Sequence, residues 1–179
     1  NMLVAGTDDG LIQITRDGGK NWTKISKFTG VPDMTYVSSV AASGFNKDVL
    51  YAAFDNHRMG DFKPYLLRSS DGGQNWAQVS ELPYYSAAPW IHKGELFLFA
   101  NKGGTKVRND DLLLLKSTDG GKTFKKMDKE NVHADHHIAW TNPNRDSHMI
   151  IGNDGGCNIS EMLGQETSCL NFGCRDIMQ

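Results

Sequence analysis

The sequence has few prolines and cysteines, little net charge and no long hydrophobic run. Its 179 residues include five prolines and three cysteines, and the formal net charge is −2. No segment approaches the roughly 18 uninterrupted apolar residues of a transmembrane helix. The near balance of charge gives no basic surface of the kind that binds nucleic acid. We therefore expect neither a membrane span nor a nucleic-acid partner.

The three cysteines, Cys157, Cys169 and Cys174, lie close to the C-terminal end. An odd number in one short stretch does not form the framework of a disulfide-rich fold, so cysteine usage does not indicate a compartment. The chain begins inside an apolar run, Met2–Gly6, with neither an initiator methionine nor a signal-peptide pattern. We interpret this start as that of an excised, processed or permuted chain.

Glycine is abundant, at 19 residues, and several glycines occur in pairs within three segments that align without gaps. These segments read TRDGGKNW at 15–22, SSDGGQNW at 69–76 and STDGGKTF at 117–124. Their aspartates are separated by 54 and then 48 residues, close to the ~40–50 residues of a propeller blade. A repeat of this period predicts consecutive β-propeller blades.

The repeated segment has the chemistry of a hairpin turn. An aspartate can accept hydrogen bonds from backbone N–H groups that follow it, the glycine pair permits positive φ, and the aromatic residue can pack over the hairpin. We therefore predict structural roles for the three aspartates and the three aromatic residues, which are Asp17, Trp22, Asp71, Trp76, Asp119 and Phe124.

These segments resemble the Asp-box, or BNR, repeat of sialidases, xyloglucanase-type glycoside hydrolases and sortilin-like propellers. The stretch HADHH at 133–137, followed by IIGNDGG at 150–156, also resembles bacterial sortilin-like repeat proteins. The Arg-Ile-Pro signature of sialidases does not occur. The resemblance implies a β-propeller and favours a secreted or cell-surface location.

Alternating and apolar runs predict strands on either side of each Asp-box. The fold class expected is all-β, a partial propeller of about three to four four-stranded antiparallel blades, covering residues 1–160. The count gives three strands for the first blade, two complete blades, and three strands for the last. After Ser160 the next Asp-box is missing, so we predict an atypical or truncated tail over 161–179. Either the chain is part of a larger propeller or copies self-associate through the unfinished edges.

In a propeller the Asp-box turns lie at one end of the blades, and ligand-binding loops are expected at the other. The strand assignment places seven loops at that other end, namely Thr7–Gly10, Phe28–Thr35, Asn56–Pro64, Glu81–Ala87, Asn101–Asp111, Asp128–His137 and Asn153–Gly156. Candidate ligand-binding residues in them are His57, Arg58, Tyr84, Tyr85, His133, Asp135 and His137.

Two of these groups support specific chemistry. In an extended loop His133, Asp135 and His137 point to one side, where they can bind a transition metal, transfer protons or hydrogen-bond neighbouring loops. Because the spacing alone is a weak metal signal, we assign no metal and no cofactor. The tyrosines can stack on a sugar or a peptide.

The turns around Asp8 and Asp154 occupy equivalent loops. They resemble a turn that carries a catalytic aspartate in xyloglucanase-type enzymes, which implies a general acid or base at Asp8 or Asp154. An inverting hydrolase needs two carboxyl groups ~6.5–9.5 Å apart, and each aspartate can instead stabilise its own turn. Two hypotheses remain, a non-catalytic sortilin-like propeller that binds a protein, peptide or glycan, and a fragment of a glycoside hydrolase.

Overall fold

The computed structural model describes residues 1–79, 85–101, 112–127, 136–145, 148–153, 156–160 and 170–172. Across these residues fifteen strands form four antiparallel sheets, and the one helical element is a single 3-10 turn, η1 (His57–Met59). This confirms the prediction of an all-β fold built as a partial propeller. No helix in these ranges has the length and apolar character needed to cross a membrane.

Each sheet is one blade, and its strands are hydrogen-bonded in chain order. Blade 1 contains β1 (Leu3–Gly6), β2 (Ile12–Thr15) and β3 (Thr23–Ile25). Blade 2 contains β4 (Tyr36–Ala42), β5 (Leu50–Asn56), β6 (Asp61–Ser69) and β7 (Ala77–Gln78). Blade 3 contains β8 (Tyr85–His92), β9 (Glu95–Asn101), β10 (Leu112–Ser117) and β11 (Lys125–Lys126). Blade 4 contains β12 (His136–Thr141), β13 (Met149–Asn153), β14 (Gly156–Ser160) and β15 (Leu170–Phe172).

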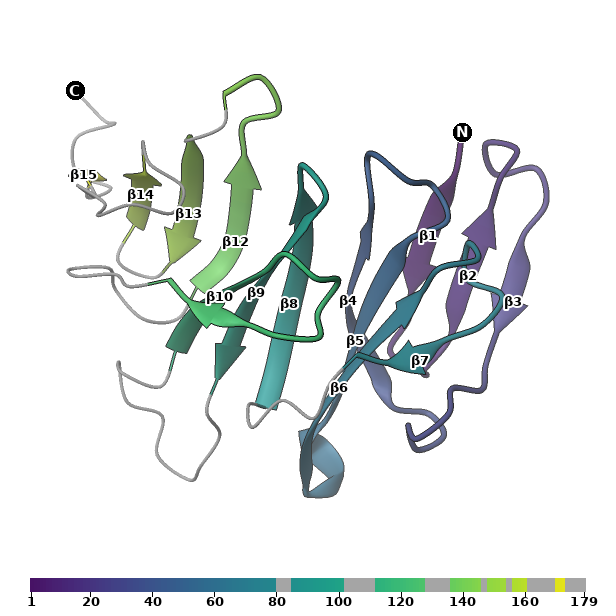
Figure 1. Cartoon of the computed structure of the whole chain (residues 1–179). Coiled ribbons are helices and arrows are strands. Elements are labelled where there is room, and N and C mark those ends of the chain that lie inside the picture. The colour runs from purple at the N-terminus through teal and green to yellow at the C-terminus, as the bar shows by residue number, and fades with distance from the viewer. Residues whose placement is uncertain are drawn as a thin grey trace.

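The blades follow one another across the molecule in chain order, from blade 1 at the right of Figure 1 to blade 4 at the left. The first strand of blade 2, β4, contacts both β1 of the preceding blade and β8 of the following one. Consecutive blades therefore contact each other through their strands, and buried apolar residues gather in cores between them.

Several strand assignments differ from the sequence prediction. Residues 56–64 were expected to form a long loop, but β6 begins at Asp61 and only a short turn separates it from β5. The extended hairpin is held by Asp61, which accepts a hydrogen bond from Asn56 across the hairpin and another from Tyr65 on its own strand. Blade 4 was expected to have three strands, and β15 pairs with β14 as a fourth.

Three apolar cores lie between consecutive blades, and alternate side chains of one strand belong to different cores. In β5, Leu50, Ala52 and Phe54 face blade 1, whereas Tyr51 and Ala53 face blade 3. Strand β9 shows the same alternation, with one set of side chains toward blade 2 and Phe99 toward blade 4. Each middle blade is thus a sheet with two buried faces.

The three Asp-box turns have one hydrogen-bonding pattern. Asp17 Oδ1 accepts from the backbone N–H groups of Lys20 and Asn21, both at 3.0 Å, and from the Thr15 hydroxyl at 2.8 Å. Its Oδ2 accepts from Asn21 Nδ2 at 2.7 Å. These donors, the Asn21 backbone first, hold the pKa of Asp17 well below its usual range. Asp71 and Asp119 are bonded within their own turns in the same way.

Candidate binding face

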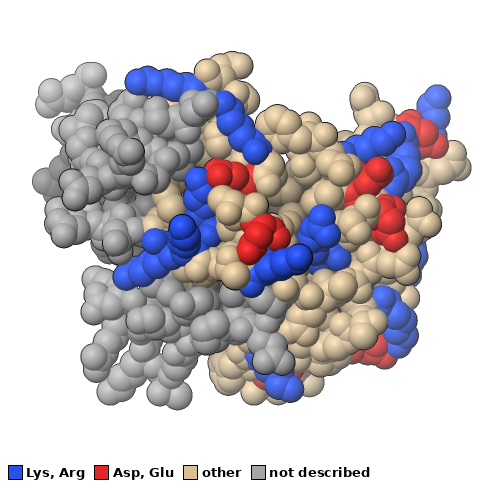
Figure 2. Space-filling model, in the orientation of Figure 1, with Lys and Arg blue, Asp and Glu red and all other residues tan. Residues whose placement is uncertain are grey.

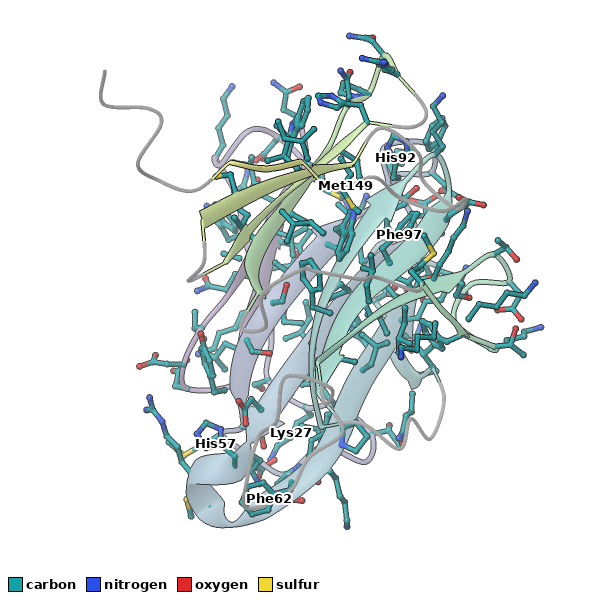
Figure 3. The ribbon with its side chains drawn as sticks, turned by 90° about the vertical axis from the view of Figure 1, so that its left-hand side faces the viewer. Lys27, His57, Phe62, His92, Phe97 and Met149 are labelled. Carbon is teal, nitrogen blue, oxygen red and sulfur yellow. The ribbon has the colours of Figure 1, made fainter. Side chains whose placement is uncertain are left out.

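The Asp-box turns lie at one end of the blades together with the β4–β5 and β8–β9 turns, and the β1–β2, β3–β4 and β5–β6 connections lie at the opposite end. Figure 3 places Lys27, His57 and Phe62 at one end of the molecule and His92, from the β8–β9 turn, at the other. We call the end that carries the β1–β2, β3–β4 and β5–β6 connections the loop face. In its described part this face is formed by residues 7–10, 26–36 and 55–65.

Among the described connections at this end, the β5–β6 hairpin projects outward with η1 at its tip (Figure 1). The Asp55 carboxylate accepts from the His57 backbone N–H at 2.9 Å and lies 2.5 Å from His57 Nδ1. The C-terminal residue of the turn, Gly60, adopts φ 75°, which closes η1 on itself. His57 and Arg58, two of the predicted ligand-binding residues, are both exposed here.

A buried tyrosine fixes the base of this hairpin. Tyr65 Oη donates to Asp61 Oδ2 at 2.5 Å, and Asn56 Nδ2 donates to the same oxygen at 3.2 Å. The Tyr65 phenol keeps the pKa of Asp61 below its usual range. Burial, followed by the adjacent Asp61 carboxylate, raises the pKa of Tyr65 to about 12. The hairpin therefore presents its tip on a fixed polar base.

The loop face also exposes large apolar side chains, which the sequence analysis did not select. Met59 at the tip of the hairpin is 80% exposed and Phe62 is 57% exposed. Met34 and Tyr36, at the start of β4, are also exposed, and Tyr36 pairs with Asp55 at the end of β5. The sequence did contain a signal for their exposure, namely apolar residues inside a segment expected to be a polar loop. Apolar residues in such a loop have no core to enter.

Asp8 lies beside this cluster, in the turn between β1 and β2. Thr7 holds the turn, since its hydroxyl bonds the Asp9 carboxylate and its Oγ1 accepts from the Leu11 N–H at 3.1 Å. The Thr7 carbonyl oxygen accepts from the Val37 N–H at 3.0 Å, which fastens the turn to blade 2. Asp8 itself is exposed, so its carboxylate is accessible to solvent at the loop face.

Several predicted site residues cannot be placed in this arrangement. Tyr84, His133, Asp135 and Asp154 lie outside the described residues. Tyr85 and His137 belong to β8 and β12, in segments that were expected to be loops. In the described ranges no group of three or more His, Cys, Asp or Glu residues is positioned to hold a metal ion.

Charge is mixed over the surface. Figure 2 shows acidic and basic side chains interspersed on the described part of this view, with uncharged surface between them. On the loop face Lys27 pairs with Asp33 across the β3–β4 connection. The described face therefore combines apolar side chains with local pairs of opposite charge, a composition that suits a mixed polar and apolar ligand.

A cavity of about 490 Å³ lies at the Asp-box end, between blades 1 and 2. Ile14 and Ile25 line it together with Arg16, Asn21 and Gln74. The corresponding junction of blades 2 and 3 has Arg68 in register with Ile14, because each precedes the Thr or Ser that opens an Asp-box.

The hydrogen-bonded turn between β2 and β3 is recognised by a protein-family model. Residues 13–24 match the BNR/Asp-box repeat. The chain has a β-propeller fold and carries a BNR/Asp-box repeat in its first blade. The other two Asp-boxes have the same sequence pattern and the same bonding, so the BNR repeat accounts for the described turns between the third and fourth strands of blades 2 and 3. A comparison with curated protein sequences gives no match.

Solved β-propellers share the fold of this chain. A structure of YCF48 bound to D1 peptide superimposes with a TM-score of 0.63 at 18% identity, over 94% of this chain and 50% of that one. The GH74 xyloglucanase of Xanthomonas campestris gives 0.64 at 14% identity, over 94% and 28%. The GH74 enzyme of Niastella koreensis gives 0.63 at 15% identity, over 94% and 27%.

The chain spans about half the length of the YCF48 structure and a little over a quarter of the two enzymes. At these identities the likeness concerns the fold. It extends to two classes of protein with different activities, as is common for propellers.

Proposed function

We propose that this chain is a non-catalytic β-propeller module that binds a peptide segment on its loop face. The observation that carries the proposal is the β5–β6 hairpin, which exposes Met59 and Phe62 on the same short segment as His57 and Arg58. Apolar anchors beside a cation and a hydrogen-bonding imidazole match a peptide, which offers side chains as well as carbonyl oxygens. The likeness to the fold of peptide-bound YCF48 supports the choice of ligand class.

The fixed base of the hairpin strengthens this proposal. Binding costs less when the contact residues are already ordered, and the Tyr65–Asp61–Asn56 hydrogen bonds order both strands below the tip. Met34 and Tyr36 extend the exposed apolar surface toward blade 1. A peptide lying from the hairpin to the start of β4 would contact all four of these apolar side chains.

A peptide array probed with the intact chain tests the proposal. Peptides selected by the wild type should bind the Phe62→Ala and Met59→Ala variants at least about tenfold more weakly, the loss expected for an interface anchor. Phe45→Ala is the matched control, because Phe45 is 72% exposed but belongs to the β4–β5 connection at the Asp-box end. Equal weakening by Phe45→Ala, or no weakening by the hairpin variants, would refute the loop-face site.

A glycan is the second candidate ligand, and hydrolysis of that glycan is the second candidate activity. The exposed Asp8 carboxylate and the likeness in fold to GH74 enzymes favour it. Release of reducing sugar from xyloglucan, lost in Asp8→Asn, would support the hydrolase. Binding of xyloglucan without turnover would support a glycan-binding module instead.

A further inference from the structure

The loop face carries two exposed methionines, and the described part of the chain exposes no other. Met34 is 76% exposed and Met59 is 80% exposed, more than any other exposed apolar side chain in the described residues. Met2 and Met127 are half-buried against the cores between blades, and Met149 is 1% exposed inside one of them. The two methionines that solvent reaches most freely therefore both lie on the proposed peptide-binding surface.

The backbone fixes Met34 in this exposed position. Its φ is 61°, in the left-handed region that residues other than glycine adopt only where the surroundings hold them. The hydroxyl of Thr35 donates a hydrogen bond of 2.7 Å to the Pro32 carbonyl oxygen, and a Cβ on Gly10 would lie 3.0 Å from Met34 Cα. The β1–β2 turn thus packs directly against the Met34 backbone, and the Met34 side chain extends into solvent.

Met59 is held at the end of η1, at the tip of the β5–β6 hairpin. The turn closes through a hydrogen bond of 2.9 Å from the Gly60 N–H to the His57 carbonyl oxygen, and no residue of η1 is buried. Met149 lies in a different environment, toward the other end of the molecule from His57 (Figure 3). A reagent in solution therefore reaches Met59 without any opening of the fold, but reaches Met149 only if a junction between blades opens.

We propose that Met34 and Met59 are oxidation sites through which a peroxide abolishes peptide binding, an inference that rests on the proposed function. One oxygen of the peroxide bonds to the thioether sulfur as the O–O bond breaks. The sulfur is oxidised by two electrons, and the other oxygen takes the proton of the transferred one and leaves as water. The product is methionine sulfoxide. Because the peroxide must reach the sulfur, Met34 and Met59 react and the buried Met149 is protected.

Oxidation converts two of the four apolar side chains of the binding surface into polar ones. The sulfoxide oxygen is hydrogen-bonded to water in the free protein, and an apolar peptide side chain placed over it removes those bonds without replacing them. Phe62 and Tyr36, the other two exposed side chains of this surface, contain no sulfur. Since neither Met34 nor Met59 is packed in a core, the fold itself keeps its stability.

The change is chemically reversible. A dithiol reduces the sulfoxide to the thioether and becomes a disulfide, with release of water, which is the reaction of the methionine sulfoxide reductases. The loop face thus has the chemistry of a reversible redox switch for binding.

Treatment of the intact chain with hydrogen peroxide tests this switch, with a peptide selected by the untreated wild type as the probe. Mass spectrometry of proteolytic fragments should detect sulfoxide at Met34 and Met59 before Met149. The oxidised wild type should bind the peptide at least about tenfold more weakly, the loss expected for an interface anchor, with an unchanged urea midpoint. Sulfoxide reductases for both epimers should restore binding.

Two leucine variants identify the methionines responsible, and each protein is compared with itself before and after treatment. The double variant Met34→Leu with Met59→Leu has apolar side chains of similar volume that form no sulfoxide, so peroxide should not change its affinity. Met127→Leu is the matched control, because Met127 is half-buried beside the core between blades 3 and 4. This control should lose binding on treatment as the wild type does.

The outcomes separate this inference from the peptide proposal. Unchanged binding after Met34 and Met59 have both been oxidised overturns the switch. So does an equal loss in the double leucine variant, which would place the effect at another residue, and so does oxidation of Met149 ahead of the other two. A chain that selects no peptide before treatment gives a different result, because it refutes the peptide proposal and the switch together.

Discussion

Arg16 Nη2 donates a hydrogen bond of 2.7 Å to the carbonyl oxygen of Gly72, and so joins the first Asp-box to the second across 56 residues of sequence. A Cβ placed on the next glycine, Gly73, would lie 2.1 Å from Ile14 of blade 1 and 3.3 Å from Leu50 of its own blade. The second Asp-box is therefore part of the contact between blades as well as a local turn.

The absence of a side chain at Gly73 permits this contact. Gly73→Ala should lower the free energy of unfolding by about 3 kcal/mol, because positive φ strains alanine by roughly 1 kcal/mol and the new methyl group crowds Ile14 at a further cost of about 1–3 kcal/mol. Urea unfolding, followed by tryptophan fluorescence, measures the loss.

Gly19→Ala is the matched control for this change. Gly19 and Gly73 have similar φ values, 99° and 93°, but only Gly73 has a neighbour at the Cβ position. The control should lose only the strain of about 1 kcal/mol. Equal losses at the two positions would show that backbone strain, not packing between blades, accounts for the paired glycines.

Tyr65→Phe should loosen the base of the β5–β6 hairpin. The change removes the hydrogen bond to Asp61 and should cost about 1 kcal/mol of stability, measured by urea unfolding. A spectrophotometric pH titration should also lose one tyrosine that ionises near pH 12. Tyr36→Phe is the control, because Tyr36 is 44% exposed. Unchanged stability in Tyr65→Phe would indicate that the strands alone hold the hairpin.

His92 should make the chain less stable in mild acid. Its ring is 7% exposed, and burial, followed by the charge of Lys93, lowers its pKa from 6.5, with Lys116 acting in the same direction and Glu95 opposing them. The unfolded chain then binds the proton more readily than the folded one, so stability falls as the pH drops below 6.5 and levels off below the folded pKa.

Replacement of His92 by Gln separates this effect from the other histidines. Urea midpoints at pH 7.5 and 5.5 should differ less in His92→Gln than in the wild type. The same decrease in both proteins would assign the pH dependence to other groups.

Asp71 should contribute stability only while it is ionised. Its folded pKa is depressed, first by the Asn75 backbone N–H, so its contribution is present above the unfolded value of 3.8 and is lost as the pH falls below it. Asp71→Asn should unfold at lower urea than the wild type at pH 7, and the two midpoints should approach each other at pH 3. A difference that is constant with pH would exclude an electrostatic origin.

Local chemistry made the Asp-box turns predictable from sequence. Every bond of Asp17 is made within a few residues of it, so the eight-residue pattern contains the whole turn. The extension of β6 was not predictable in this way, because it depends on Asp61 meeting Asn56 across the hairpin. Strand β15 was missed because no Asp-Gly-Gly turn precedes it.

The loop-face cluster was predicted only in part. His57 and Arg58 were selected because charged loop residues are typical of binding sites, and Asp8 because of its turn. Met59 and Phe62 have no periodic pattern that predicts exposure, since an apolar residue is ordinarily expected in a core. Their exposure follows from the position of the hairpin at the end of blade 2, which the sequence pattern alone does not specify.

Strands β5 and β9 each contribute side chains to two junction cores, and this gives the chain the energetics of a linear array. Its stability is a sum of single-blade and nearest-neighbour terms, so a perturbation at one junction weakens the adjoining blades first and distant ones little. Insertion or deletion of a whole blade rebuilds one junction and leaves the others unchanged. Lineages of such proteins can therefore change length in blade-sized steps.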